Sequence, residues 1–526
     1  MSSKQIIAGA ILLGLSSLIS RLLGVYRDHL FGIMFGTTST GIHDIGVYLT
    51  AFRIPDFLYT VLIYGAISTA FIPIFTELIT KKDDKKACDF ATNITNTLIL
   101  FLLICEIIIF IFTPYLTKIF AAGFTGERLD LMIKLTRIML LSPIFFGISS
   151  IFQGIQNTYK IFLYPALAPI FYNLSIIIGT LFFAKNYGIY GLAISVCIGA
   201  FLHMLIQIPQ TIKLGFKYKF SINLKNYEMK RFFKLMIPRI IGLSVDQLTL
   251  IINSNFATTL SYSATTVLPY AVNIQSLPLG LFGIAVAIAS FSTFSEMAAN
   301  KDHEKVSYVL KQSISNILFF VIPSAIGLYI IKYDVINLIF GGGKFTQNDI
   351  ILTGDTLSFL LIGLAFQSIT PILARIFYSY HDTKTPLYTA IFAILINIIA
   401  VFITTKILNL DVKGIALAIS LTGIFNSIIL AIALKFKLNL QNFFPFKNTI
   451  KIIISSSLMG VFVYKISPLI INQLHLNFTG LILKITNLAI PISLGIILYI
   501  IFAILLKIPE IYTLLNKCFP NSKFKI

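Results

Sequence analysis

Charged side chains gather in the first long apolar stretch of the sequence, where their types suggest chemistry with an anionic group. Arg21, Gly24 and Asp28 recur three and four residues apart, which places them on one stripe of a helix, while Arg27 lies off that stripe. Arginine stays charged at any depth, and its planar guanidinium can hold two phosphate oxygens at once. The pattern predicts phosphate binding, although Arg27 and Asp28 could instead neutralise each other and pin helices together.

The second apolar stretch carries Asp44, Arg53 and Asp56, with Pro55 between the last two. An ionised side chain at mid-bilayer costs roughly 2.5–3.5 kcal/mol on insertion scales, so such charges indicate function. A proline frees a backbone carbonyl and bends the helix, which requires a wet or protein-lined surrounding. Together the two stretches predict a hydrated, mostly cationic cavity.

Later stretches contain further polar and helix-bending residues. Asp246, Asn253 and Asn397 are candidate ligands of a cation such as Na⁺. Pro278 and Gly280 predict a bending point, although close packing of helices through small residues explains the same glycines equally well.

The elements that position these residues must be membrane-spanning helices. The chain has 526 residues, of which 57% are hydrophobic and 12% are charged, against about 25% charged in soluble domains. Continuous apolar runs near 20 residues long favour helices over a barrel. We expect an all-α membrane protein whose fourteen spans lie near residues 6–30, 46–78, 90–112, 131–156, 163–184, 188–211, 231–259, 265–298, 308–331, 350–378, 387–408, 412–434, 449–471 and 480–506.

The loops between these spans divide by charge. Most lysines lie in alternate loops, among them the run Lys81–Lys86 and the stretch 213–234, and the positive-inside rule then places both termini in the cytoplasm. The net charge of +20 is therefore read as a topology signal and as contacts with anionic membrane lipids, and not as nucleic-acid binding.

The sequence repeats itself weakly. Six landmarks recur in order at separations of 218 to 225 residues, namely Arg21/Arg239, Pro55/Pro278, Glu77/Glu296, Pro165/Pro386, Asn173/Asn397 and Leu192/Leu417. Because each unit holds six spans, the two lobes have the same orientation. We expect a six-helix lobe over 1–215, a second over 216–440, and two additional helices with a basic tail over 441–526. Such two-lobed proteins are typically transporters.

Enzymatic chemistry finds little support in the sequence. The four cysteines are scattered, the six histidines show no metal-ligand spacing, and no Ser/His/Asp arrangement is readable. We expect no enzyme, no metal and no cofactor.

Several segments resemble the MurJ/MviN family of lipid II flippases. The segment 20–28 (SRLLGVYRD) is similar to the family signature R-x-x-G-x-x-R-D, and 51–55, 65–73, 277–285 and 375–386 are also similar to the family.

The resemblance implies the fold of the multidrug/oligosaccharidyl-lipid/polysaccharide exporter superfamily. It implies a bacterial inner-membrane protein that moves lipid II to the periplasmic leaflet by alternating access, for peptidoglycan synthesis, alongside cell-wall synthesis machinery. Driving force would come from membrane potential or Na⁺. By position, Arg21, Arg27, Asp28 and Asp44 would bind the substrate. Asn273 stands at a substrate-binding position where many members carry an arginine, a departure for which the cation Arg53 would compensate. Apart from the resemblance, Gly24, Pro55, Pro278 and Gly280 are candidate helix breaks or bends. A flippase for another polyprenyl-pyrophosphate oligosaccharide, or a drug exporter of the superfamily, is the alternative.

Overall fold

The computed structural model describes residues 3–65, 67–300, 302–473 and 480–518, without the side chains of residues 3–11, 13, 64, 68, 69, 238, 241, 246, 517 and 518. Helices account for almost all of this part of the chain, and no sheet forms in it. Thirteen helices or helix pairs in the described residues are long and apolar enough to cross a membrane. The 33-residue helix α1 (Ser3–Phe35) comes in addition. The expected all-helical membrane fold of about fourteen spans is confirmed.

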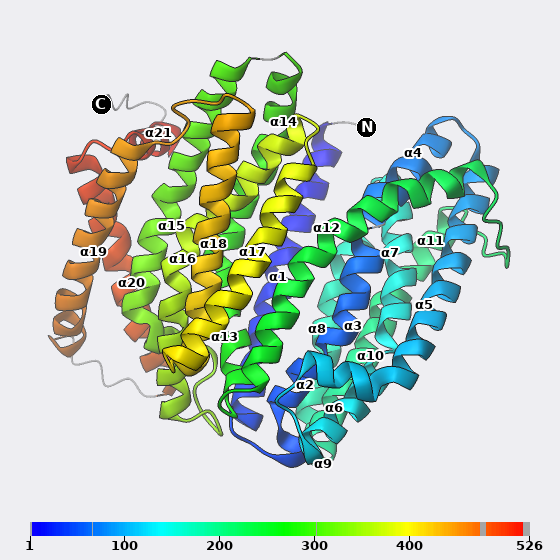
Figure 1. Cartoon of the computed structure of the whole chain (residues 1–526), viewed down its shortest axis with the longest axis horizontal. Helices are drawn as coiled ribbons and strands as arrows, with labels where there is room; N and C mark the ends of the chain where they lie inside the picture. The colour runs from blue at the N-terminus through cyan, green and yellow to red at the C-terminus, as the bar shows by residue number, and fades with distance from the viewer. Residues whose placement is uncertain (1–2, 66, 301, 474–479, 519–526) are drawn as a thin grey trace. The chain divides into compact units, whose positions relative to one another are not determined.

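The chain forms two compact units (Figure 1). Unit 1 comprises residues 1–266 and 342–346, and unit 2 comprises 267–341 and 347–526. The α-helices that begin in unit 1 are α1, α2 (Ile45–Ala51), α3 (Arg53–Leu58), α4 (Ile72–Thr80), α5 (Asp84–Phe120), α6 (Gly126–Met139), α7 (Ser142–Thr158), α8 (Leu163–Phe182), α9 (Ala184–Tyr187), α10 (Ile189–Leu205), α11 (Ile208–Lys213), α12 (Tyr227–Thr258) and α13 (Ala264–Pro278).

The boundary between the two units lies within α13, between residues 266 and 267. The remaining α-helices of unit 2 are α14 (Ala285–Ala299), α15 (His303–Ile339), α16 (Gln347–Ser379), α17 (Lys384–Phe402), α18 (Asp411–Lys437), α19 (Phe446–Gln473), α20 (Gly480–Leu505) and α21 (Pro509–Cys518). Short π-helical segments occupy Tyr59–Tyr64, Ile67–Phe71, Leu279–Ile284 and Ile403–Ile407, and a 3₁₀ turn spans Gly41–His43.

The stretch predicted as one helix over 46–78 is interrupted. α2 ends at Ala51 and α3 begins at Arg53, with Phe52 between them. Pro55 explains this position, because its ring excludes the carbonyl four residues earlier, which belongs to Ala51, and it donates no hydrogen bond. Two π-helical segments follow before α4, so this span is made of short pieces. The span predicted over 131–156 is likewise divided, into α6 and α7.

Unit 1 includes α12, which packs against α5 and against the π-helical segments Tyr59–Tyr64 and Ile67–Phe71. Its side chain Arg231 forms an ion pair with Glu77 of α4. The segment 342–346 joins the unit through the backbone N–H of Lys344, which donates to Ile33 O at 2.8 Å. Glycine is required beside this contact, because Gly36 has a φ of +63° and a Cβ there would lie 2.4 Å from the Lys344 carbonyl oxygen. The boundary predicted between 215 and 216 rests on the sequence repeat and stays a prediction.

Unit 2 is built around α16 and α18, which lie against each other. Their approach is close because a Cβ at Gly363 would lie 2.5 Å from Ser420 Cα, and Ser420 Oγ accepts from the Gly363 N–H at 3.1 Å. Helices α19 and α20 pack on α15. Lys484 of α20 donates to the carbonyls of Asn337 and Gly341 at 2.9 and 2.8 Å, so it caps the end of α15.

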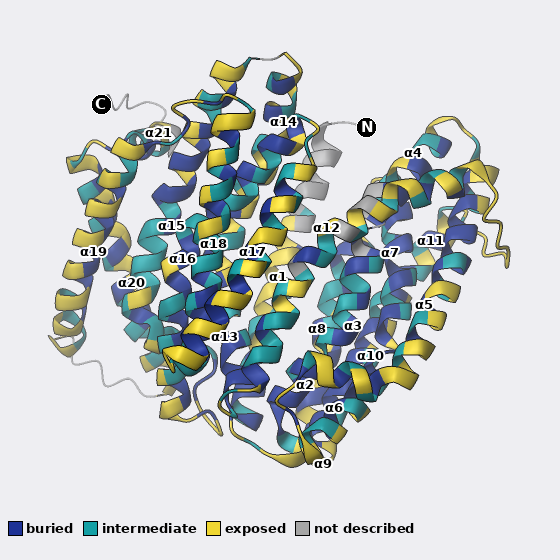
Figure 2. Cartoon of the chain, in the orientation of Figure 1, coloured by how far each residue is buried: buried dark blue, intermediate teal, exposed yellow. Residues whose placement is uncertain are grey.

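Exposed residues lie along many of the helices (Figure 2), and large apolar side chains are frequent among them. On α5, Ile107, Ile111 and Tyr115 recur at a spacing of four and are 58, 60 and 68% exposed. In water such a stripe would be costly, whereas hydrocarbon receives it readily.

The amphipathic helix α21 was not anticipated, because we expected only a basic tail after the last span.

The turn between α16 and α17 depends on Asp382, which belongs to one of the segments that resemble the family. Its Oδ1 accepts from the backbone N–H groups of Lys384 and Thr385, and its Oδ2 accepts from Thr385 Oγ1. Lys437 at the end of α18 pairs with Oδ2 at 2.7 Å. Partial burial alone would raise the pKa of Asp382, but the hydrogen bonds from Lys437 and Thr385 outweigh it and lower the pKa to about 2.

We expect Asp382→Asn to lower the free energy of unfolding of the detergent-solubilised protein by about 1 kcal/mol at neutral pH, because Lys437 loses the carboxylate with which it pairs. A depressed folded-state pKa stabilises above the unfolded pKa, near 3.9, and this contribution disappears as the pH falls toward about 2. The difference between variant and wild type should therefore narrow below about pH 4 in thermal denaturation. Lys384→Gln, an exposed change in the same turn, is the control. A difference that is constant from pH 7 to pH 3 would contradict this role.

Candidate functional site

Arg27 and Asp28 form an ion pair within α1. Arg27 Nη2 lies 2.8 Å and Nε 3.0 Å from Asp28 Oδ1, while Arg27 Nη1 donates to Asn173 Oδ1 on α8 at 3.2 Å. The Asn173 amide is held in turn, because its Nδ2 donates to Ser20 Oγ and Pro169 O, each at 3.2 Å. The pairing that the sequence left open is therefore present within α1, and the hydrogen bonds of Asn173 with Arg27 and Ser20 tie α1 to α8. A phosphate bound at Arg27 must displace Asp28 or share the guanidinium with it.

Arg21 lies six residues earlier on α1 and is exposed. Within the described part of the chain, no carboxylate is paired with its guanidinium, in contrast to Arg27. Its five N–H donors are thus available to an anion. Gly24 lies on the helix between these two arginines, and a Cβ built there meets no described atom within 4 Å. This glycine is therefore not needed for close packing within the described residues, and its role as a helix break stays a prediction.

Arg53 and Asp56 lie one turn apart on the short helix α3, and both are partly exposed. They belong to the interrupted span, which Pro55 divides. A carboxylate so close lowers the net charge of this turn to zero, so it offers a dipole and not a fixed positive charge. The role of Arg53 as a substrate contact stays a prediction.

Asp44 is sequestered by protein. Its side chain is 2% exposed, and its Oδ2 lies 2.8 Å from Arg128 Nε and accepts from the Tyr262 hydroxyl at 2.6 Å. Its Oδ1 caps α2 by accepting from the Val47 N–H at 3.1 Å. The Arg128 guanidinium lies 4.2 Å from the Phe124 ring centroid and 3.8 Å from that of Tyr262. We call Asp44, Arg128 and Tyr262 the aspartate latch. It joins α2, α6 and the α12–α13 loop within unit 1.

Sequence reasoning missed Arg128 and Tyr262 as partners of Asp44. They lie far from Asp44 along the chain, and no local spacing links them. The only available signal was that Asp44 and Arg128 both fall in loops on the same predicted side of the membrane.

The candidate residues of unit 2 lie on α13 and the π-helical segment after it. Asn273 is exposed on α13, and Gly280 lies in the π-helical segment that begins directly after Pro278. The neighbouring Gly283 serves close packing, because a Cβ there would lie 2.9 Å from Ser368 Cα. The motif thus combines a change of helix geometry at Leu279–Ile284 with a close approach to α16, while the bending point at Pro278 and Gly280 stays a prediction.

The candidate cation ligands divide between the units. The side chain of Asp246 lies outside the described residues. Asn253 of unit 1 is 4% exposed, and its buried Oδ1 has no hydrogen-bond partner among the described residues. Asn397 of unit 2 is fully buried. Its Nδ2 donates to Thr422 Oγ1 at 3.2 Å, and its Oδ1 has no partner within the described part of the chain. No group of three or more His, Cys, Asp or Glu side chains forms a metal-binding cluster in the described part of the chain.

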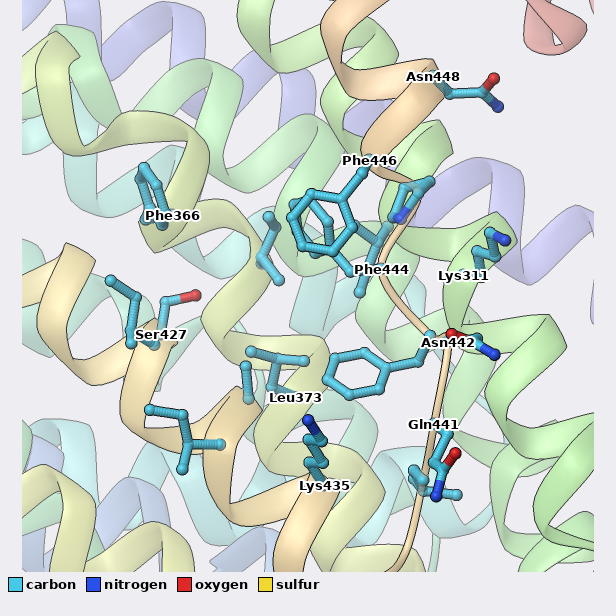
Figure 3. Close-up of a pocket in the computed structure, with 18 of the residues that line it drawn as sticks. Lys311, Phe366, Leu373, Ser427, Lys435, Gln441, Asn442, Phe444, Phe446 and Asn448 are labelled. Atoms are coloured by element: carbon cyan, nitrogen blue, oxygen red, sulfur yellow. The ribbon is translucent and has the colours of Figure 1, made fainter.

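A cavity within unit 2 has a volume of about 910 Å³ (Figure 3). Its walls come from α15, α16, α18 and the loop that leads into α19, and they are mainly apolar, including Phe366, Leu373 and Phe444. Lys311 and Lys435 also line it. A cavity of this composition suits a hydrocarbon chain with a negative charge nearby.

The family described as lipid II flippase MurJ matches residues 34–485. The chain belongs to this family. The lipid II flippase MurJ of Thermosipho africanus is 30% identical over 499 residues, which cover 95% of this chain and 96% of that protein. The probable lipid II flippase MurJ of Borreliella burgdorferi is 30% identical over 400 residues, covering 76% and 78%.

Solved structures agree with this assignment. A lipid II flippase MurJ in an inward closed conformation is similar with a TM-score of 0.78 and 29% identity, covering 94% of this chain and 99% of that one. An inward-facing MATE multidrug transporter of the MOP superfamily has a TM-score of 0.66 at 15% identity and covers 82% of this chain and 98% of that one. The second likeness shows the fold alone. The chain is thus a multi-pass membrane protein of a flippase family.

We expect Arg128→Gln to destabilise the protein by about 3 kcal/mol, because Asp44 would be left as a buried charge without its partner. Tyr262→Phe should cost about 1–3 kcal/mol, the penalty of an unmade hydrogen bond to a buried acceptor. Chemical denaturation in detergent measures both.

The matched control is Lys134→Gln, an exposed lysine on the same helix as Arg128. It should change stability by less than about 0.5 kcal/mol. If Arg128→Gln is no more destabilising than this control, the aspartate latch does not stabilise unit 1.

Proposed function

We propose that this chain flips lipid II from the cytoplasmic to the periplasmic leaflet of the bacterial inner membrane by alternating access. The observation that carries the proposal is the match of the lipid II flippase MurJ family over residues 34–485. The relatives and the solved MurJ structure support it, because they extend over most of the chain. Membership in a transporter family also favours transport over catalysis.

The charges of α1 suit an anionic lipid headgroup. Lipid II carries a pyrophosphate, whose oxygens an arginine fork holds bidentately. Arg21 supplies an exposed guanidinium for this, and Arg27 supplies a second one if Asp28 yields its place. Arg27 would pair with Asp28 before the substrate binds and with phosphate afterwards. The net charge of this part of α1 would therefore differ between the empty and the substrate-bound protein.

The membrane topology and the driving force also depend on charge. The lysine-rich alternate loops favour cytoplasmic termini by the positive-inside rule. An inside-negative membrane potential moves negative charge outward and contributes about 2.3 kcal/mol per charge per 100 mV. Na⁺ coupling through Asp246, Asn253 or Asn397 is the other proposed source. It is supported by the buried amide oxygens of the two asparagines, which have no hydrogen-bond partner in the part of the chain that the structure describes. Cell-wall synthesis machinery would consume the product.

Complementation of a bacterial strain depleted of its own lipid II flippase tests this function. We expect the unmutated chain to restore growth and Arg21→Ala to abolish rescue, because the exposed cation is lost. Arg21→Lys should rescue partly, since it keeps the charge but not the bidentate fork. Arg27→Ala should also fail, since it leaves Asp28 unpaired and removes the second fork.

Lys185→Ala, an exposed change elsewhere in unit 1, is the control for expression and insertion and should rescue fully. Full rescue by both Arg21→Ala and Arg27→Ala would rule out the role of α1. Failure of the correctly inserted unmutated chain would favour a different polyprenyl-linked oligosaccharide as the substrate.

A further inference from the structure

A second cavity in unit 2, of about 520 Å³, combines basic and apolar walls. It lies near the C-terminal end of α15 and the N-terminal ends of α16 and α18. Its charged and polar lining consists of Tyr329 and Lys332 from α15, Asp355 and Ser358 from α16, and Lys413 from α18. None of these residues belongs to the set discussed above for lipid II.

Lys332 is the central group of this cavity. Its side chain is only 11% exposed, its Nζ donates to Ser358 Oγ at 2.8 Å, and it lies 4.5 and 4.8 Å from the ring centroids of Tyr329 and Tyr333. An ammonium has three N–H donors, and only the one to Ser358 is used at hydrogen-bond distance within the described residues. Burying such a group is costly unless an anion completes its environment.

Asp355, the acidic residue of the cavity, does not supply the anion that Lys332 requires. Asp355 lies 3.9 Å from both Lys332 Nζ and Lys413 Nζ, which is longer than a hydrogen bond. Its Oδ1 is occupied instead by the Tyr333 hydroxyl at 2.7 Å. Two ammonium groups therefore share one carboxylate at long range. The cavity keeps a net positive charge, with donors left to bind an anion.

The remaining walls are apolar. Ala325 and Ile326 of α15 and Phe359 and Ile362 of α16 lie beside the charged group. The stripe continues along α16, because Phe366, Ile369 and Leu373, spaced three and four residues apart, line the larger cavity of Figure 3. An apolar face thus leads from the lysines toward the middle of the helix. Free phosphate would gain nothing from it, whereas an acyl chain would.

We propose that this cavity binds an anionic phospholipid, whose phosphate contacts Lys332 and Lys413 and whose acyl chain lies along Ala325, Phe359 and Ile362. In the proposed orientation this is a lipid of the outer leaflet. The phosphate accepts hydrogen bonds from the remaining N–H groups of Lys332. It also neutralises the positive charge that Asp355 alone does not balance. The bound lipid joins α15, α16 and α18 at one end of unit 2, so it stabilises this unit independently of the transported substrate.

Native mass spectrometry of the full-length protein in detergent tests the proposal, with dioleoyl phosphatidylglycerol as the anionic probe and dioleoyl phosphatidylcholine as the neutral one. We expect phosphatidylglycerol to bind more tightly. Lys332→Gln and Lys413→Gln should each weaken its binding about fivefold, since one lysine near a lipid phosphate contributes about 1 kcal/mol. Phosphatidylcholine binding should be unchanged by either substitution.

Ala325→Phe tests the apolar half without changing charge, and it should weaken phosphatidylglycerol binding by filling the cavity. Lys406→Gln, an exposed lysine of the α17–α18 connection, should leave binding unchanged. A thermal melt in detergent shows whether each variant is folded, and Ala325→Phe keeps the test decisive if a lysine variant is not.

Equal affinity for the two phospholipids, or unchanged phosphatidylglycerol binding by the lysine variants and by Ala325→Phe, would overturn the proposal. So would displacement of phosphatidylglycerol by undecaprenyl pyrophosphate at a matched low concentration, because the cavity would then belong to the transported lipid.

Discussion

The ion pair between Arg27 and Asp28 shows the constraint on which the rest of this molecule depends. A charge inside a membrane-spanning helix must have a partner, water or a ligand, because hydrocarbon offers none. Arg27 meets this requirement through Asp28 and Asn173, and in doing so it holds α1 against α8. Asp44, which is buried directly before α2, is likewise partnered by Arg128 and Tyr262. The charges in unit 1 thus organise the packing of its helices as well as any substrate.

Not all the cations are treated in this way. Arg21 is exposed, and Lys332 and Lys413 share one distant carboxylate. Where the chain places a cation without a close acid, a negatively charged lipid is the natural complement in a bilayer. On α1 the match to the lipid II flippase family supports the transported substrate as this complement. In unit 2 the geometry favours an ordinary anionic phospholipid.

The helices and their approximate ends could be predicted because membrane spans leave a strong signal in hydropathy. The span expected over 350–378 is α16, Gln347–Ser379, and that over 480–506 is α20, Gly480–Leu505. Within a span the signal weakens. Pro55 indicated an interruption, but its place at Phe52 and the π-helical turns after it depend on backbone hydrogen bonds that composition does not reveal.

Contacts between side chains were harder to predict than the helices themselves. The Arg27–Asp28 pair was foreseeable because the residues are adjacent, whereas Asn173 comes from a helix far along the chain. Asp44 was assigned to substrate from its charge and from the resemblance to the family, whereas its burial beside Arg128 and Tyr262 depends on tertiary packing. Sequence therefore located the charges well, but it did not distinguish those that bind protein from those that remain open to a ligand.

The central claim is that the protein itself moves lipid II across a bilayer, and reconstitution measures this most directly. Purified full-length protein would be placed in phosphatidylglycerol-containing vesicles with labelled lipid II in the inner leaflet, and a membrane-impermeant enzyme would cleave headgroups that reach the outside. We expect cleavage to increase with time in vesicles that contain the protein and to remain low in protein-free vesicles and in vesicles with Arg21→Ala. Equal cleavage with and without the folded protein would contradict the account.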